Sequence, residues 1–302
     1  MTPYQRTRCR IVLCGDDSLL VHAEESQQTG VVNIWSTLYK TYRKAHDLIV
    51  LGVTIGPGKG IFFFPLWVEL WRQPSLRKQT RPQRMAAALL RLQLQLKEYD
   101  VSLCGLDFVV DNGYLSPVVV KAVNQCGLIM TSNIRYNEKL SLLSGEQKEA
   151  SEIKQMLSVN PPRFDVRAGE QGYYWRIDTV HPRLGKGTLV IQRRKLRNGK
   201  YKHRYYFSQH QNAKGITVLQ IAKRRWPCEV FFREGKQKIG LGHLSYRKWQ
   251  SLRGHVALRG LLYWLLSNTR RCLRLKQKTI GALKRRWQDK LLLAFSCLVS
   301  SS

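Results

Sequence analysis

The chain is poor in acidic residues: 20 Asp or Glu stand against 51 Lys or Arg, and the net charge is +31. The imbalance lies in one half, because residues 1–150 carry a net charge of +5 and residues 151–302 carry +26. Hydrophobic residues make up 43% of the sequence, which excludes a disordered basic tail and allows a buried core. A folded chain with one strongly basic half is typical of a protein that binds a polyanion.

Several familiar sites and segments are missing. The seven cysteines include no Cys-x2-Cys pair and no zinc-like spacing to a histidine, so we expect reduced thiols that serve mainly in packing. Gly56–Gly60 fails the spacing of a phosphate-binding P-loop, and Ser18 lacks a histidine partner for hydrolase chemistry. The apolar runs at residues 261–266 and 291–299 are too short to cross a membrane and are expected to be core helices. The first residues lack the apolar run of a signal peptide, so we expect a cytoplasmic protein.

Residues 10–135 predict the element order β-β-β-α-β-α-β. The expected strands are residues 10–14, 31–39, 48–54, 105–110 and 128–135, and the expected helices are residues 85–99 and 117–126. A short helix is expected at residues 149–159, whereas the aromatic-rich stretch 61–71 predicts no definite element. From Tyr173 to Phe207 aromatic, β-branched and basic residues alternate, and Asn198-Gly199 is a strong hairpin signal. We therefore expect an antiparallel β module at residues 165–210, whose basic run 193–195 is either a solvated face or a phosphate contact.

Three acids are candidates for a metal centre. Asp16 is expected to end the first strand and Asp111 the fourth, and Glu229 lies in a run expected to be helical. Arg225 and Lys236, four residues before and seven residues after Glu229, would share its helical face. Hard cations such as Mg²⁺ prefer carboxylate oxygens, and two of them can activate water and stabilise the leaving oxygen of a phosphodiester. The three acids therefore predict phosphodiester chemistry.

Each of these residues also fits an ordinary role. Asp16 and Asp17 could belong to a turn after a strand, Asp111 could begin a turn, and Glu229 could pair with a nearby arginine. Which of the first two aspartates would bind metal stays open, although we prefer Asp16. Trp226 is expected either in the core or flanking a DNA backbone. The order and spacing of the three acids favour the catalytic interpretation.

Together these residues resemble the DDE transposases of bacterial insertion sequences. The similarity is to the subgroup whose glutamate lies in the motif Tyr-x2-Arg-x3-Glu-x6-Lys, which Arg225, Glu229 and Lys236 match. The position of the motif tyrosine is Ala222, and Pro227 is tolerated only in a first helical turn, which would place Arg225 just before the helix. The resemblance covers roughly residues 10–270.

The resemblance implies an α/β fold with an RNase H-like mixed sheet, flanking helices and an inserted antiparallel β module. We expect the first part of the core at residues 1–150, the module at 151–215, and the helical completion with basic C-terminal helices at 216–302. Family members usually carry a helical DNA-binding domain ahead of the core. Because the first strand is expected near residue 10, we expect that domain to be lacking.

The resemblance also implies a function. Asp16, Asp111 and Glu229 would hold Mg²⁺ or Mn²⁺, and Arg225 and Lys236 would contact DNA near the cut. The expected activity is cleavage and strand transfer at the ends of an insertion sequence. It would be carried out by a homodimer on double-stranded end and target DNA, in association with a bacterial nucleoid and without a membrane partner. Two alternatives stay open: a truncated, non-catalytic remnant that binds DNA, and another RNase H-like, structure-specific nuclease.

Overall fold

The fold is known from a computed structural model, which describes residues 10–22, 28–36, 39–56, 61–71, 79–159, 163–165, 172–196, 198–243, 248–272 and 285. The chain forms two compact units, one made of residues 1–16 and 79–226 and the other of residues 17–78 and 227–302. The first strand passes from the first unit to the second between Asp16 and Asp17, and a later helix does so between Trp226 and Pro227.

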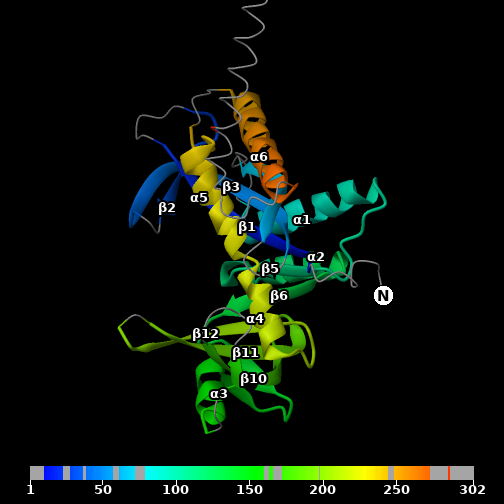
Figure 1. Ribbon diagram of the computed structural model, residues 1–302, viewed down its shortest axis with the longest axis vertical. Helices are drawn as coiled ribbons and strands as arrows, with labels where there is room; N and C mark the ends of the chain where they lie inside the picture. Colours follow the sequence, from blue (N-terminus) through cyan, green and yellow to red (C-terminus); the bar gives the residue numbers. More distant parts are fainter. Residues whose placement is uncertain are drawn as a thin grey trace, which may run out of the picture. The chain divides into compact units, whose positions relative to one another are not determined.

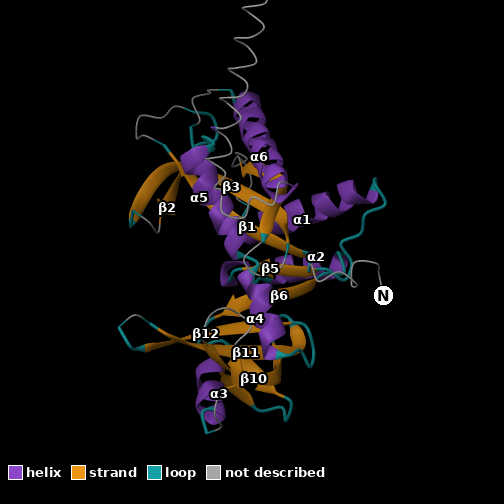
Figure 2. Cartoon of the chain, in the orientation of Figure 1, coloured by secondary structure: helices purple, strands orange, loops and turns teal. Residues whose placement is uncertain are grey.

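The described elements are shown in Figures 1 and 2. The strands are β1 (Val12–Val21), β2 (Val32–Ser36), β3 (Thr41–Ile55), β4 (Phe62–Trp71), β5 (Asp107–Val110), β6 (Ile129–Ile134), β7 (Lys139–Leu142), β8 (Gln147–Glu149), β9 (Arg163–Asp165), β10 (Gly172–His181), β11 (Gly185–Lys195) and β12 (Tyr201–Ser208). The helices are α1 (Arg81–Lys97), η3 (Asn112–Tyr114, a 3₁₀ turn), α2 (Pro117–Gln125), α3 (Ala150–Leu157), α4 (Gly215–Lys223), α5 (Trp226–Lys238) and α6 (Trp249–Cys272).

The first unit is built on a mixed sheet. Its parallel part is β1-β5-β6, with Cys14 opposite Val109 and Val110 opposite Ser132. The first and fourth predicted strands are therefore neighbours in this sheet, as β1 and β5. The helix α2 makes the crossover from β5 to β6 that a parallel pair requires.

The antiparallel part of this sheet continues from β6 in the order β12-β11-β10-β7-β8, and β9 also pairs with β10. The predicted antiparallel strands and the hairpin at Asn198-Gly199 are thus present, with Gly199 at a φ of 77° that suits glycine. The strands β7 and β8 precede residue 151 and yet belong to this antiparallel part. The bounds of the three predicted segments, 1–150, 151–215 and 216–302, stay predictions.

Helices flank the sheet of the first unit for reasons that the local sequence explains. The helix α1 begins with a capping box, in which Thr80 and Gln83 each accept a hydrogen bond from the backbone N–H of the other. It buries Met85, Leu89 and Leu92 and packs against α2. Burying each of these side chains stabilises the fold by about 2 kcal/mol. The helix α4 lies over β6, β11 and β12.

The second unit has its own antiparallel strands. β3 pairs with β2 through residues 41–45 and with β4 through residues 47–55. β1 is a further neighbour of β3 in the sheet. The helix α6 packs on β4. Phe231 of α5 lies 5.5 Å from Phe63 of β4 and 4.8 Å from Tyr263 of α6, measured between ring centroids. These aromatic contacts fix α5 within the second unit.

The predicted fold class is confirmed: the chain is mixed α/β, with a large mixed sheet and flanking helices. The elements differ from the prediction at residues 62–71 and at the start of β3. Residues 62–71 form a strand, which was missed because their continuous run of apolar residues shows no alternation. β3 begins at Thr41, before the predicted start at Leu48, because its exposed first residues pair with β2.

Other predictions have mixed outcomes. Residues 261–266 lie in α6, so the predicted helix is confirmed, but the predicted core position is wrong for Leu261, Trp264 and Leu265, which are exposed. Residues 57–60 and 291–299 lie outside the described part of the chain. The five cysteines in the described part are reduced thiols: Cys14, Cys126 and Cys228 are buried, whereas Cys104 and Cys272 are exposed. No helix among the described residues has both the length and the hydrophobicity for a membrane crossing.

Candidate active site

Asp16 lies inside β1 and not at its end. The predicted strand end is wrong, because β1 continues through Leu20 to Val21. Asp16 is only 7% exposed, and the guanidinium Nη1 of Arg225 donates a hydrogen bond to its Oδ2 at 2.6 Å. This ion pair explains how a strand accommodates a buried carboxylate at a position where the local sequence favours a turn.

Asp111 directly follows β5, as predicted, and caps the short helix η3. Its Oδ1 accepts the backbone N–H of Gly113 at 2.9 Å, which fixes the carboxyl group. Cys14 is opposite Val109 in the parallel register, and two further residues along each strand bring Asp16 level with Asp111. Adjacent strands lie roughly 4.8 Å apart, so this register, continued past Val109, places the two acids at the same level on neighbouring strands.

Arg225 lies in the turn between α4 and α5. The predicted common helical face with Glu229 is therefore wrong, because α5 begins only at Trp226. Pro227 explains this start, since its missing N–H and fixed φ suit the first helical turn. The turn is also held to β1 by Cys14, whose Sγ donates to the carbonyl oxygen of Arg224 at 3.1 Å. Trp226 is 57% exposed, which excludes the core alternative for it.

Glu229 and Lys236 lie in the first and last turns of α5, in the second unit. The ammonium group of Lys236 donates to Ser18 Oγ at 2.8 Å and to the carbonyl oxygen of Leu19 at 2.7 Å. Burial lowers the pKa of Lys236, since its partners are neutral and offset little of the lost hydration. Lys236 therefore ties α5 to the last part of β1.

The donor chemistry fits a divalent cation. Asp16 and Asp111 supply the carboxylate oxygens that Mg²⁺ prefers. Within the described ranges, no group of three or more His, Cys, Asp or Glu side chains is gathered as a metal site. Arg225 already engages one oxygen of Asp16, so a cation at Asp16 must share or replace that contact.

The loop after Asp111 is held by a hydrogen bond from a distant arginine, which the sequence did not predict. The guanidinium Nη1 of Arg183, in the turn between β10 and β11, donates to the carbonyl oxygen of Leu115. His181 fixes this turn, because its Nδ1 accepts the N–H groups of Arg183 at 3.1 Å and Leu184 at 3.4 Å. No local pattern marks these residues, since Arg183 and Leu115 are 68 positions apart.

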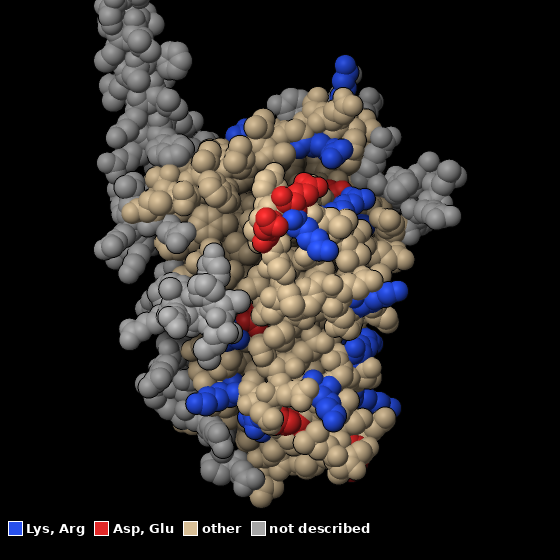
Figure 3. Space-filling view, turned by 90° about the vertical axis from the view of Figure 1, so that its right-hand side faces the viewer, with Lys and Arg blue, Asp and Glu red and all other residues tan. Residues whose placement is uncertain are grey.

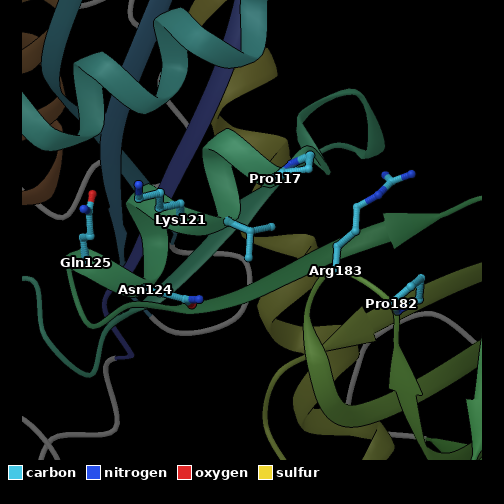
Figure 4. A pocket seen from close by; sticks show the side chains of 7 residues that line it. Pro117, Lys121, Asn124, Gln125, Pro182 and Arg183 are labelled. Atoms are coloured by element: carbon cyan, nitrogen blue, oxygen red, sulfur yellow. The ribbon is translucent and has the colours of Figure 1, made fainter.

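The same turn borders a pocket of about 640 Å³ beside α2 (Figure 4). Its polar lining consists of Lys121, Asn124 and Gln125 from α2 and Arg183 from the turn. None of the three candidate acids lines it. The pocket is therefore distinct from Asp16 and Asp111, which we call the paired aspartates. Arg183 lines the pocket and also bonds to Leu115 in the loop after Asp111.

The free energy of unfolding is expected to fall as the pH is lowered from about 6.5 towards 4. Burial, with Arg183 nearby, lowers the pKa of His181 from 6.5 to about 4. Between these values the unfolded chain binds more protons, so stability is present above pH 6.5 and is lost as the pH falls. His181 is 1% exposed, and the shift corresponds to at most on the order of 3 kcal/mol. Urea denaturation at pH 7.5, 6 and 5 measures this loss.

The matched variant is His181→Asn, which keeps a side-chain acceptor for the turn and removes the titrating ring. It should be less stable at pH 7.5 and lose less stability on acidification than the wild type. Part of the loss should persist, because burial also lowers the pKa values of His22 and His46 in the second unit. Equal losses in the two proteins would show that His181 does not control the pH dependence.

The surface charge agrees with a polyanionic ligand. Figure 3 shows one face over which Lys and Arg side chains are spread, while most of its Asp and Glu side chains form one cluster. Phosphate backbones are attracted to a surface of this kind, and salt weakens that attraction.

Comparison with known proteins gives one family. A family model described as "Transposase DDE domain" matches residues 85–265, more than half of the chain. The matched range includes Asp111, Arg225, Glu229 and Lys236 and begins after Asp16. No curated protein matches the chain.

Two solved structures show distant similarity. The NurA nuclease from Sulfolobus solfataricus is 11% identical, with 72% of this chain and 73% of that chain covered and a TM-score of 0.31. The Ciona intestinalis Endonuclease V, in complex with a 24mer DNA containing an inosine followed by a ribo-adenosine, is 8% identical, with 75% and 87% covered and a TM-score of 0.29. Similarities this distant carry no information about activity.

Proposed function

The chain belongs to the transposase DDE domain family, and from this premise we propose that it cleaves DNA at the ends of an insertion sequence and joins the freed strand to a target. The observation that carries the proposal is the parallel register of β1 and β5, which brings Asp16 level with Asp111. The spacing of Arg225, Glu229 and Lys236 supports the Tyr-Arg-Glu-Lys subgroup.

We propose that Asp16, Asp111 and Glu229 hold Mg²⁺ or Mn²⁺. The support for Glu229 is the motif spacing and its place in the first turn of α5. When bound, the ions would activate the attacking oxygen and stabilise the leaving one. Gly113 holds the Asp111 carboxyl group in place through its N–H, and Arg183 braces the following loop, so the position of this one carboxyl group is preorganised.

The reaction then has two steps. Water attacks the phosphodiester at the element end, and the bond to the 3′-oxygen breaks, which frees a 3′-hydroxyl group on the element. That hydroxyl group attacks a target phosphodiester in line, the target 3′-oxygen leaves, and a new phosphodiester joins element to target. Both steps are phosphoryl transfers, so one set of residues serves both.

The basic residues of the motif have separate roles in this proposal. Arg225 leaves Asp16 for a DNA phosphate, and the exposed ring of Trp226 flanks the same backbone. Lys236 positions β1 after Asp16 and contacts DNA only if its bonds to Ser18 and Leu19 are exchanged for a phosphate. The partners are double-stranded end and target DNA, bound by a homodimer.

The test uses a labelled duplex that carries the flanking repeats of the encoding locus, a second duplex as target, and Mg²⁺. We expect cleavage at the repeat end and labelled products joined to the second duplex. Cleavage without joined products would indicate a structure-specific nuclease. Salt-sensitive binding without cleavage would indicate an end-binding remnant.

A further inference from the structure

The outer part of the β11–β12 hairpin, residues 192–204, is strongly basic. Seven of its thirteen residues are Lys or Arg, and none is Asp or Glu. Figures 1 and 2 show the hairpin as an arm that extends from the sheet. We call this segment the outer hairpin.

Strand pairing sorts the basic residues of the outer hairpin onto two faces. Arg194 lies opposite Lys202, and Gln192 opposite Arg204, so the three cations share one face. All three are exposed. Lys202 and Arg204 are two residues apart along β12, roughly 6.8 Å, which is similar to the separation of successive phosphates along a nucleic-acid strand.

The opposite face is engaged within the protein. The Arg193 guanidinium lies 3.7 Å from the centroid of the Tyr201 ring, and His203 lies 6.0 Å from Trp175 between ring centroids. Arg193 and His203 are partly buried. These contacts hold Arg193 and His203 against aromatic rings of the protein, whereas Arg194, Lys202 and Arg204 are exposed.

This exposed face costs folding energy. Like charges directly opposite each other on two strands are destabilising, and Arg194 and Lys202 are such a pair. None of the described Asp or Glu residues pairs with either of them or with Arg204. A bound polyanion would remove the repulsion.

The strand registers place the outer hairpin just beyond the level of Asp111 in the sheet. Val110 is opposite Ser132, which is opposite Phe207, so the level of Asp111 corresponds to Tyr206. Residues 201–204 therefore project beyond that level, on the side towards which β5 runs. β12 is two strands away from β5, roughly 10 Å.

We propose that Arg194, Lys202 and Arg204 bind the sugar-phosphate backbone of double-stranded DNA next to the segment held at the paired aspartates. The contact is independent of base sequence, because it is made to phosphates and not to base edges. It deepens the proposed function, on which it depends for the identity of the polyanion. Its role is to hold and orient the duplex during cleavage.

The test is the salt dependence of duplex binding by the triple variant Arg194→Ala/Lys202→Ala/Arg204→Ala, measured without divalent metal. The slope of log K against log salt should fall in magnitude by about 2–3, since each phosphate contact contributes roughly 0.9. The control Lys97→Ala/Lys139→Ala/Lys186→Ala removes three exposed cations from elsewhere in the same unit and should keep the wild-type slope. The charge-preserving variant Arg194→Lys/Arg204→Lys should also keep it.

The outcomes distinguish DNA binding by the outer hairpin from DNA cleavage by the protein. An unchanged slope in the first triple variant would overturn the proposal, and unchanged binding with increased self-association would show that the cations only protect the edge of β12. Equal losses in both triple variants would also overturn it, since net charge alone would then explain them. If the slope falls as expected but the wild type never cuts DNA, the arm stands and the proposed function fails.

Discussion

Asp111→Asn is expected to lower the rate of Mg²⁺-dependent DNA cleavage by roughly 10³-fold, because losing a carboxylate ligand forfeits several kcal/mol of transition-state stabilisation. Asn keeps the side-chain oxygen that accepts the N–H of Gly113 at 2.9 Å, so the loop after β5 should be preserved. DNA binding should change by less than about twofold, because it depends mainly on phosphate contacts made by cations. Single-turnover cleavage and binding titrations with the same duplex measure the two effects.

Glu146→Gln is the matched control. Glu146 is an exposed acid of the same unit, paired with Lys148 at 2.8 Å, and no candidate function involves it. This variant should cut at the wild-type rate. If Asp111→Asn also cuts at that rate, Asp111 is not a metal ligand, and its only role is to cap η3.

Arg225→Ala is expected to make folding stability depend strongly on divalent metal. The variant leaves the buried carboxylate of Asp16 without its guanidinium partner at 2.6 Å, which should cost about 1–3 kcal/mol without metal. A cation bound at Asp16 supplies the missing positive charge. In this variant the cation no longer competes with the Arg225 guanidinium for the carboxylate. Mn²⁺ at about 100 times its dissociation constant stabilises by about 2.7 kcal/mol, and the tighter-binding variant should gain more than the wild type. Thermal unfolding with and without Mn²⁺ measures the difference.

The double variant Asp16→Asn/Arg225→Ala is the control for this effect. It carries no charge at position 16, so Mn²⁺ should raise its unfolding temperature by less than that of Arg225→Ala. The same Mn²⁺-induced shift in the wild type and both variants would show that Arg225 does not compete with metal for Asp16. A structural ion pair would then be the only role of the contact.

The strand before each of Asp16 and Asp111 could be predicted from sequence, because its signal is local. Apolar runs followed by an acid predicted two strands, and the parallel pairing of β1 with β5 brings the acids level. Pro227 also carried a local signal, since its tolerance in a first helical turn indicated that Arg225 precedes α5. These inferences needed only backbone preferences.

The remaining features depend on contacts between distant residues. β1 continues past Asp16 because Arg225, 209 positions later, offsets the cost of its buried charge. The brace from Arg183 to Leu115 likewise has no local signature. Trp226 is exposed although the apolar surface of its ring favours burial. Sequence patterns report preferences of single residues and do not identify such partners.

The most direct test of the three-acid centre concerns Glu229, because its assignment rests on motif spacing. The measurement is Mg²⁺-dependent cleavage of the labelled duplex with the flanking repeats of the encoding locus, by the wild type and by Glu229→Gln. We predict cleavage at the repeat end by the wild type, none by the variant, and equal DNA binding by both. Cleavage by Glu229→Gln at the wild-type rate would contradict the three-acid centre.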